Sequence, residues 1–321
     1  MTGKGNNKKK FEVLVVGELN VDIILNGMDS MPSMGTEILA DEMTVTLGSS
    51  SAILASNIST LGVKTAFLGK VGQDDFGKLV LDTLAGKKVD TGFIFRSADK
   101  KTGATIVLNY DNDRAMVTYP GAMEDLTVED IMMAHLETAG HLHVSSVFLQ
   151  PGIKKNIVSL FEKAKKAGMT TSLDVQWDPE EKWDIDFAGL LPFVDVFLPN
   201  ETELLAITGE TTIDRAIKQI APFANTIALK MGAKGSLGVH GKERWEQPPF
   251  LNEQVVDAIG AGDSFNAGFI SAFIRGGSLQ ECLRKGNICG AVNTTTAGGT
   301  GAFVSLKSVR ETAKNKFDVD I

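Results

Sequence analysis

A carboxylate directly follows a glycine-rich turn in the last third of the chain. Gly260, Ala261 and Gly262 precede Asp263, and the small and apolar residues 264–274 predict a helix that begins here. Glycines let a backbone turn tightly and approach a ligand closely, and the free N–H groups at a helix start attract an anion. An anion site beside a carboxylate suits phosphoryl transfer to a hydroxyl, because the carboxylate can take the hydroxyl proton. The same residues would also fit a plain helix start capped by Asp.

Polar residues also follow the first predicted strand, which spans residues 11–16. Asn20 and Asp22 come just after its end. In open α/β sheets, ligands bind beyond the carboxyl ends of the strands, and amides and carboxylates can each make two hydrogen bonds to sugar hydroxyls. We therefore expect Asn20 and Asp22 to contact a polyhydroxyl ligand, although a solvated turn would also place polar residues here.

A segment of small residues starts the helix predicted over residues 49–61. It contains Gly48, Ser49 and Ser50, and Ile53 follows one turn later. Its backbone and serine hydroxyls can bind a polyol, and the serines can equally cap the helix. The residues alone are compatible with both roles.

Two segments in the C-terminal half are candidates for a nucleotide and its metal. Asn200 and Glu203 begin a helix directly after a strand. Acidic residues are common at helix starts, but Mg²⁺ uses few protein carboxylates and keeps several waters, so one Glu acting through water is physically sensible. A strand also runs through Lys230 into Gly232 and Gly235, where glycines permit a close backbone approach, as they would in a plain hairpin turn.

These residues are positioned by helices that alternate with short apolar strands. The expected strands are 11–16, 64–68, 141–145, 170–174, 194–198, 226–229 and 236–240. The expected helices are 49–61, 74–86, 153–166, 201–208, 213–221, 262–274 and 279–296. This alternation predicts a mainly parallel sheet with helices on both faces. No Gly-x-Gly-x-x-Gly follows the first strand, which argues against a Rossmann dinucleotide site.

The composition favours a globular enzyme. The 321 residues carry a net charge of −8, which argues against non-specific nucleic-acid binding, and 43% are hydrophobic, enough for a large core. The sequence contains no run of about 18 apolar residues, so no membrane span is expected. Cys282 and Cys289 lie seven residues apart in a predicted helix, too far along its axis for a disulfide, so we expect buried thiols and a cytoplasmic location.

Residues 257–269 closely resemble the C-terminal signature of the ribokinase-like (PfkB) sugar and nucleoside kinases, and the resemblance extends from Val13 to about Phe303. It implies a ribokinase-like three-layer sandwich with a mainly parallel central sheet and a small β-sheet lid over the sugar site.

The expected domain organisation follows from this resemblance and from the composition. Residues 1–10, rich in Lys, Asn and Gly, are expected to be a disordered tail, and residues 11–321 a single α/β kinase domain. The β-rich segments at about 18–47 and 100–119 are expected to form the lid, which projects from one edge of the sheet.

The resemblance also assigns roles to individual residues. It makes Asp263 the general base beside an anion hole at Gly260, Ala261 and Gly262. The expected substrate-binding residues are Asn20, Asp22, Gly48, Ser49, Ser50, Ile53, Arg114 at the tip of the lid hairpin, and Gln150 after an apolar strand. The expected ATP-binding residues are Asn200, Lys230, Gly232, Gly235 and Asn287.

Two departures from the family pattern concern the substrate. Ser49 replaces the second glycine of the usual Gly-Gly pair, and Ile53 stands where the family has an Asn that bonds the substrate. A site that lacks a polar partner cannot discriminate the same hydroxyl. The resemblance further implies Mg²⁺ near Glu203, through water, and K⁺ beside the hole, with Asp257 and the Ile259 carbonyl as ligands.

We therefore expect an ATP-dependent phosphotransferase that phosphorylates a hydroxyl, a primary alcohol, of a small sugar or sugar derivative, as ribokinases and fructokinases do. The alternatives are an adenosine-like nucleoside kinase and a non-catalytic sugar-binding relative. We expect a small-molecule partner, neither nucleic acid nor membrane, and a homodimer through the lid, because unpaired strand edges are templates for association.

Overall fold

The computed structural model describes residues 9–110 and 113–321. Most of the predicted tail, residues 1–8, lies outside the described residues, as do residues 111–112 of the lid hairpin. Lys10, at the end of the predicted tail, forms an ion pair with Asp90 at 3.2 Å.

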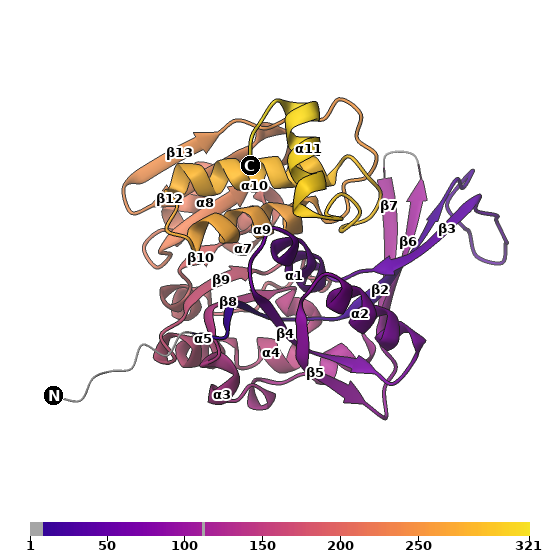
Figure 1. The fold of residues 1–321 in the computed structure, drawn as a ribbon, viewed down its shortest axis with the longest axis horizontal. Helices are drawn as coiled ribbons and strands as arrows, with labels where there is room; N and C mark the ends of the chain where they lie inside the picture. Colours follow the sequence, from indigo (N-terminus) through magenta and orange to yellow (C-terminus); the bar gives the residue numbers. More distant parts are fainter. Residues whose placement is uncertain (1–8, 111–112) are drawn as a thin grey trace.

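A large sheet forms the centre of the molecule (Figure 1). Its strand order is β13-β12-β11-β10-β9-β8-β1-β4-β5, and neighbours are parallel except in the antiparallel pairs β11–β12 and β12–β13. The strands are β1 (Phe11–Val16), β4 (Thr65–Gly72), β5 (Asp90–Ser97), β8 (Ala139–Ser145), β9 (Thr170–Asp174), β10 (Val196–Phe197), β11 (Thr226–Lys230), β12 (Ser236–His240) and β13 (Glu243–Gln247). The predicted mainly parallel sheet is confirmed.

The two edge strands were not predicted from the sequence. β13 is largely exposed and highly charged, and β5 is only half-buried along most of its length. Edge strands of this kind lack the apolar run that marks a buried strand, because one side of each has no neighbour to cover it.

Hydrophobic clusters on the two faces of the sheet explain the layers. Along β1, Leu14 and Val16 belong to one cluster, whereas Val13 and Val15 belong to the other. Successive side chains of a strand point to opposite faces, so the apolar run in this central strand reflects burial on both sides. Helices cover each face, which gives the three layers.

The helices divide between these faces. One face is covered by α3 (Met133–Leu136), α4 (Pro151–Lys154), α5 (Ile157–Lys166), α6 (Phe187–Leu190), α7 (Glu201–Thr208) and α8 (Ile213–Ile220). The other is covered by α1 (Ser50–Thr60), α2 (Asp75–Gly86), α9 (Ala261–Phe273), α10 (Leu279–Asn293) and α11 (Leu306–Phe317). Short 3-10 turns span Gly121–Asp125, Val128–Asp130, Val147–Leu149, Leu191–Phe193 and Gly232–Lys234. In the described segments, none of the helices combines the length and apolarity needed to cross a bilayer.

A second, smaller sheet projects from one side of the body (Figure 1). Its strand order is β3 (Glu42–Leu47), β2 (Asn20–Asn26), β6 (Gly103–Tyr110) and β7 (Asp113–Tyr119). The strands come from the two segments that we predicted as the lid, and β2 pairs with β6 in parallel although they are far apart in the chain.

Asp74 ties the lid segment to the body. It caps α2 by accepting the Gly77 N–H at 2.8 Å, and it accepts both the N–H and the hydroxyl of Thr102, at 2.8 and 2.7 Å. Thr102 directly precedes β6. One carboxylate therefore orders both a helix start and the start of a lid strand.

We predict that Asp74→Ala lowers the free energy of unfolding by about 1–2 kcal/mol, because a cap and two further hydrogen bonds are lost. Urea denaturation measures this change. Asp82→Ala, which removes an exposed partner of Lys78 on the same helix, is the matched control and should cost less than about 0.5 kcal/mol. Equal losses in the two variants would contradict the role given to Asp74.

Candidate active site

The carboxylate of Asp263 is buried at the start of α9, with only 7% of the residue exposed. Its Oδ1 accepts hydrogen bonds from the Ser50 hydroxyl at 2.6 Å and from the Gln176 amide at 3.2 Å. Burial raises the pKa of Asp263 to about 7, against the lowering effect of the Ser50 hydrogen bond. A carboxyl that titrates near neutrality is suited to accept a proton during catalysis.

The backbone before Asp263 adopts a conformation that requires glycine. Gly260 has φ of +75°, and a Cβ there would lie 2.5 Å from the Cα of Gly299. The Ala261 N–H donates to the Ala258 carbonyl at 3.2 Å. In the predicted anion hole, the backbone N–H of Ala261 is thus already used in a hydrogen bond. The N–H groups of Gly262 and Asp263 lie in the first turn of the helix, where N–H groups have no partner within the helix.

Ile53 and Asn57 of α1 support this loop from behind. Ile53 is buried and packs against Gly260 and Gly299, and it also lines the cavity beside Asp263. Asn57, one helical turn later, donates to the Gly299 carbonyl and to the Ser264 hydroxyl, both at 2.9 Å. An apolar contact therefore takes the place of the amide expected at position 53, and an amide one turn away ties the loop to α1.

Asp257 and Ile259 order the segment just before the glycine turn. Asp257 accepts the N–H groups of Ile259 and Gly298, one on each carboxylate oxygen and both at 2.8 Å. The Ile259 carbonyl accepts from the Asn293 amide at 2.6 Å. The two predicted K⁺ ligands thus lie within one hydrogen-bonded loop.

A cavity of about 750 Å³ opens beside Asp263, between the lid and the body, and we call it the acceptor cavity. Most of the predicted substrate-binding residues line it: Asn20, Asp22, Ser49, Ser50, Ile53 and Arg114. Gly48 lies behind them, where a Cβ would come within 2.2 Å of an Asp22 oxygen, so glycine leaves room for that carboxylate.

Gln150 is the exception among the predicted substrate-binding residues. Its side chain is fully buried and donates to the carbonyls of Ser145 and Ser146, at 2.9 and 3.2 Å. Ser146 has φ of +52°, a left-handed conformation that turns the chain after β8. The turn directs the Gln150 amide back onto the strand end, and the structure does not bring it to the acceptor cavity.

The wall of the acceptor cavity nearest the lid is polar and acidic. The Asn20 amide donates to the Thr105 hydroxyl at 2.6 Å. Burial, with a smaller contribution from the charge of Glu18, raises the pKa of Asp22 to about 6, although Arg114 opposes the shift. Glu18 also lines the cavity and accepts from the backbone N–H and the hydroxyl of Ser51.

A second cavity, of about 330 Å³, lies on the other side of the first turn of α9, and we call it the nucleotide cavity. Among the predicted ATP-binding residues, it is lined by Lys230, Gly232, Gly235 and Asn287. Asn287 also donates to the carbonyls of Gln247 and Pro248, at 3.1 and 3.0 Å. The lining is mostly apolar and includes the charged Lys230, which suits a flat base with a charged tail.

A buried charged cluster lies beneath both cavities. Lys230 pairs with Asp174 at 2.6 Å, and Asp174 also accepts from the amides of Gln176 and Asn266. Burial would lower the pKa of Lys230, but Asp174 and the nearby Glu203 raise it, so the amine stays charged. A Cβ at Gly262 would lie 3.7 Å from its Nζ. A fixed positive charge therefore stands at the start of α9.

Asn200 and Glu203 form a reciprocal cap at the start of α7. The Asn200 side chain accepts the Glu203 N–H at 2.8 Å, and Glu203 accepts the Asn200 N–H and amide at 2.9 and 2.6 Å. Burial raises the pKa of Glu203 to about 7, with a further contribution from Asp174. Asn200 does not line the nucleotide cavity, so its clear role is to hold Glu203 beside the charged cluster.

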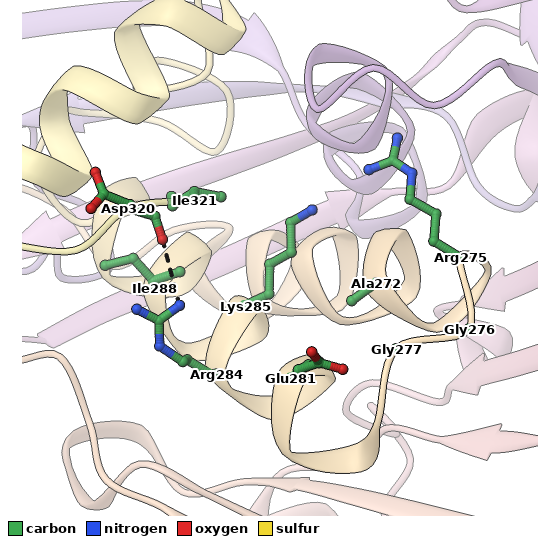
Figure 2. A pocket seen from close by; sticks show the side chains of 10 residues that line it. All are labelled: Ala272, Arg275, Gly276, Gly277, Glu281, Arg284, Lys285, Ile288, Asp320 and Ile321. Carbon is green, nitrogen blue, oxygen red and sulfur yellow. Dashed lines mark hydrogen bonds between the residues drawn. The ribbon is translucent and has the colours of Figure 1, made fainter.

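Another surface hollow, of about 460 Å³, lies at the far end of α9 and beside α10 (Figure 2). Arg275 and Lys285 extend into this region, while Arg284 bonds to the Asp320 carbonyl at 3.5 Å. Two carboxylates, Glu281 and Asp320, line the hollow, and Glu281 is engaged in capping α10 through Ser278. The hollow lacks a buried carboxylate beside a glycine turn, so the acceptor and nucleotide cavities remain the candidate active site.

Glu18, Asn57 and Asn266 also belong to this site, although no sequence motif pointed to them. The one signal in the sequence is an amide or carboxylate within an apolar helix or beside an apolar strand. Such a side chain is expected to be buried, and a buried polar group needs hydrogen-bond partners. Its direction becomes clear only when the opposing elements are in place.

The comparisons with known proteins agree with this geometry. The model of the pfkB family carbohydrate kinases matches residues 10–305. Ribokinase from Arabidopsis thaliana is 30% identical over 317 residues, 94% of this chain and 81% of that protein. Fructokinase from Vibrio alginolyticus is 28% identical over 315 residues, 91% of this chain and 95% of that protein.

Solved structures share the fold. The structure of Arabidopsis thaliana ribokinase complexed with ribose and ATP has a TM-score of 0.80 and 27% identity, covering 95% of this chain and 99% of that one. Adenosine kinase from Sinorhizobium meliloti, at 24% identity, has a TM-score of 0.82 over 95% of this chain and 99% of that one. The ribokinase-like sandwich with a β-sheet lid is confirmed, and the chain belongs to the pfkB family of carbohydrate kinases, which phosphorylate sugars with ATP.

Proposed function

We propose that residues 11–321 form one kinase domain in which Asp263 is the general base for phosphorylation of a primary hydroxyl of a small sugar. The observation that supports this most is the buried Asp263 carboxylate, which lies at the first turn of α9 between the acceptor and nucleotide cavities. Ser50 and Gln176 both donate to Oδ1. We therefore assign Oδ2 to the acceptor hydroxyl.

The charge that develops on the transferred phosphoryl group is stabilised by the first turn of α9 and by Lys230. The N–H groups of Gly262 and Asp263 supply the positive end of the helix dipole. Lys230 supplies a fixed charge that Asp174 holds in position. Positioning and electrostatics provide most of the catalysis in phosphoryl transfer.

Mg²⁺ fits beside this cluster as a water-bound ion. Both oxygens of Glu203 already accept hydrogen bonds from Asn200, which agrees with a role through water, since Mg²⁺ keeps several of its waters. The ion would neutralise phosphate charge. K⁺ is proposed at the Asp257 loop, where the carboxylate and the Ile259 carbonyl each accept backbone or amide N–H groups and retain lone pairs.

The acceptor that we propose is a small sugar of the ribokinase or fructokinase type. Asn20 and Asp22 face it from the lid, and their amide and carboxylate match the hydroxyls of a polyol. A nucleoside is the second candidate, favoured by the aromatic and apolar residues that line the same cavity, among them Trp177 and Phe148. The presence of both the Asp263 carboxylate and the charged cluster of Lys230 and Asp174 argues against a non-catalytic relative.

A homodimer through the lid is supported by the register of the smaller sheet. One row of paired residues, Asp22, Thr105 and Thr118, lines the acceptor cavity. The adjacent row, on the other face, pairs Ile106 with Val117, which are 42% and 65% exposed. Val45 and Ile23 complete that apolar row. An exposed apolar sheet face of this kind is typical of an interface.

Asp263→Asn is predicted to lower kcat by about 10²- to 10⁴-fold, because the general base is lost, while the KM for ATP stays within about twofold. Coupled ADP release with Mg²⁺ and K⁺, across a panel of sugars, sugar acids and nucleosides, measures this and identifies the acceptor. Replacing K⁺ by a bulky organic cation in the same assay tests the Asp257 loop. Full turnover in a folded Asp263→Asn variant would disprove the assignment.

The raised pKa of Asp263 predicts the pH dependence. The base must be deprotonated to accept the hydroxyl proton, so kcat/KM should fall about tenfold per pH unit below about 7 and level off above it. Ser50→Ala removes a hydrogen bond that lowers this pKa, so the acidic limb should move to higher pH. A profile that is flat down to pH 5.5, or unmoved by Ser50→Ala, would refute this account.

For the dimer, the double variant Ile106→Lys, Val117→Lys is predicted to sediment as a monomer, because two charges per subunit would be buried without partners. Analytical ultracentrifugation over a range of concentrations measures the change. Val304→Lys alters an even more exposed apolar residue outside the lid and should leave the assembly as in the parent. A parent chain that is monomeric at all concentrations would remove the proposal.

A further inference from the structure

The acceptor cavity is lined by both polar and apolar residues. The lid contributes the polar Asn20, Asp22 and Arg114 as well as Val107 and Met116, whereas the body contributes a group of aromatic and apolar residues. These are Phe148, Leu149, Pro151, Trp177 and Pro179. The polar residues can recognise hydroxyl groups, and the aromatic and apolar group suits a different feature of the acceptor.

Trp177 is the aromatic residue of this group that is most open to solvent. It is 45% exposed although it is one of the largest apolar side chains. Its ring meets Trp183 edge-on at 5.2 Å between centroids, and Trp183 meets Phe148 in the same way at 5.3 Å. Edge-to-face packing holds each ring against its neighbour. The three aromatic side chains therefore form one packed surface that is partly open to the cavity.

The loop that holds Trp177 is fixed by hydrogen bonds. Asp178 is buried and accepts the backbone N–H groups of Glu180, Lys182 and Trp183, at 2.9, 2.9 and 2.7 Å. Gln176, on the other side of Trp177, has a left-handed φ of +59°. Such backbone conformations cost energy in residues other than glycine and concentrate at functional sites.

We propose that Trp177, backed by Trp183 and Phe148, stacks against an apolar ring face of the acceptor and thereby determines which acceptors are used. This inference rests on the proposed kinase function and deepens it. An apolar ring face can be the C–H face of a free sugar or the base of a nucleoside, and both would lie flat on an indole.

The position of Trp177 in the chain links this stacking to the chemistry. The preceding residue, Gln176, donates its amide to Asp263, Ser50 and Asp174, at 3.2, 2.9 and 3.0 Å. An acceptor that stacks on Trp177 therefore lies beside Gln176, the residue that orients the general base Asp263. Trp177 is a specificity residue in this arrangement, and it takes no part in proton transfer.

Tryptophan emission tests the contact without any need for turnover. The chain has three tryptophans, Trp177, Trp183 and Trp245. Ribose and adenosine are each titrated without ATP into the parent, Trp177→Phe and Trp245→Phe. Trp245 is 41% exposed on β13 and does not line the acceptor cavity, so it is the matched control. We expect an emission change in the parent and in Trp245→Phe, and loss of most of it in Trp177→Phe.

Kinetics provide the second readout. Trp177→Ala should raise the KM for the acceptor about tenfold for a free sugar and about 100-fold for a nucleoside, the range expected for loss of an aromatic stacking partner. The KM for ATP and kcat should stay within about twofold. Trp177→Phe should recover most of the acceptor affinity because it keeps an aromatic face.

The relative effect on the two acceptors identifies the source of the ring face. An unchanged acceptor KM in a folded Trp177→Ala variant, together with an unchanged emission response in Trp177→Phe, would overturn the inference and leave the kinase function intact. Absence of turnover on every sugar and nucleoside in the parent would instead overturn the proposed function on which the inference rests.

Discussion

The Asp263 carboxylate is removed from water at the start of α9, and much of the site is arranged around it. Burial of a carboxyl disfavours its charged form, and the pKa rises to about 7. Hydrogen bonds from Ser50 and Gln176 keep it oriented, and the hydrogen bond from Ser50 limits the rise in pKa. The loop that precedes Asp263 packs closely against the backbone at Gly299. Glycine is needed at position 260 because a Cβ there would lie 2.5 Å from the Cα of Gly299. A base near neutrality and a helix start open to an anion thus share one short segment.

The same segment borders two cavities. Lys230, whose charge is maintained by Asp174 and Glu203, lines the nucleotide cavity. Asp263 lines the acceptor cavity. Asp174 accepts from Lys230, Gln176 and Asn266, so one buried carboxylate holds together groups that face both cavities. Loss of any one of these donors would leave Asp174 with less compensation for its burial.

The lid shows how a small sheet can serve two surfaces at once. Because side chains alternate along a strand, residue Asp22 faces the acceptor cavity while its neighbour Ile23 belongs to the exposed apolar row. A shift of one residue in the pairing of β2 with β6 would exchange these faces. The acceptor site and the proposed dimer interface therefore depend on the same register, which the tie between Asp74 and Thr102 helps to position.

The sequence by itself determined the features that depend on local backbone chemistry. The alternation of helices and strands, the glycine turn before Asp263, and the turn through Gly232 and Gly235 were all predicted, because glycines and apolar periodicity act within a few residues. The edge strands β5 and β13 were missed, since their exposure removes that periodicity.

Tertiary structure decided where buried polar side chains point. Gln150, expected at the substrate, bonds back to its own strand end, while Asn57 reaches across to the Gly299 loop. Glu18 and Ser51, 33 residues apart, meet at the start of α1. The direction of such a side chain depends on which distant element supplies its hydrogen-bond partner. That pairing exists only once the layers have packed, so no local pattern in the sequence encodes it.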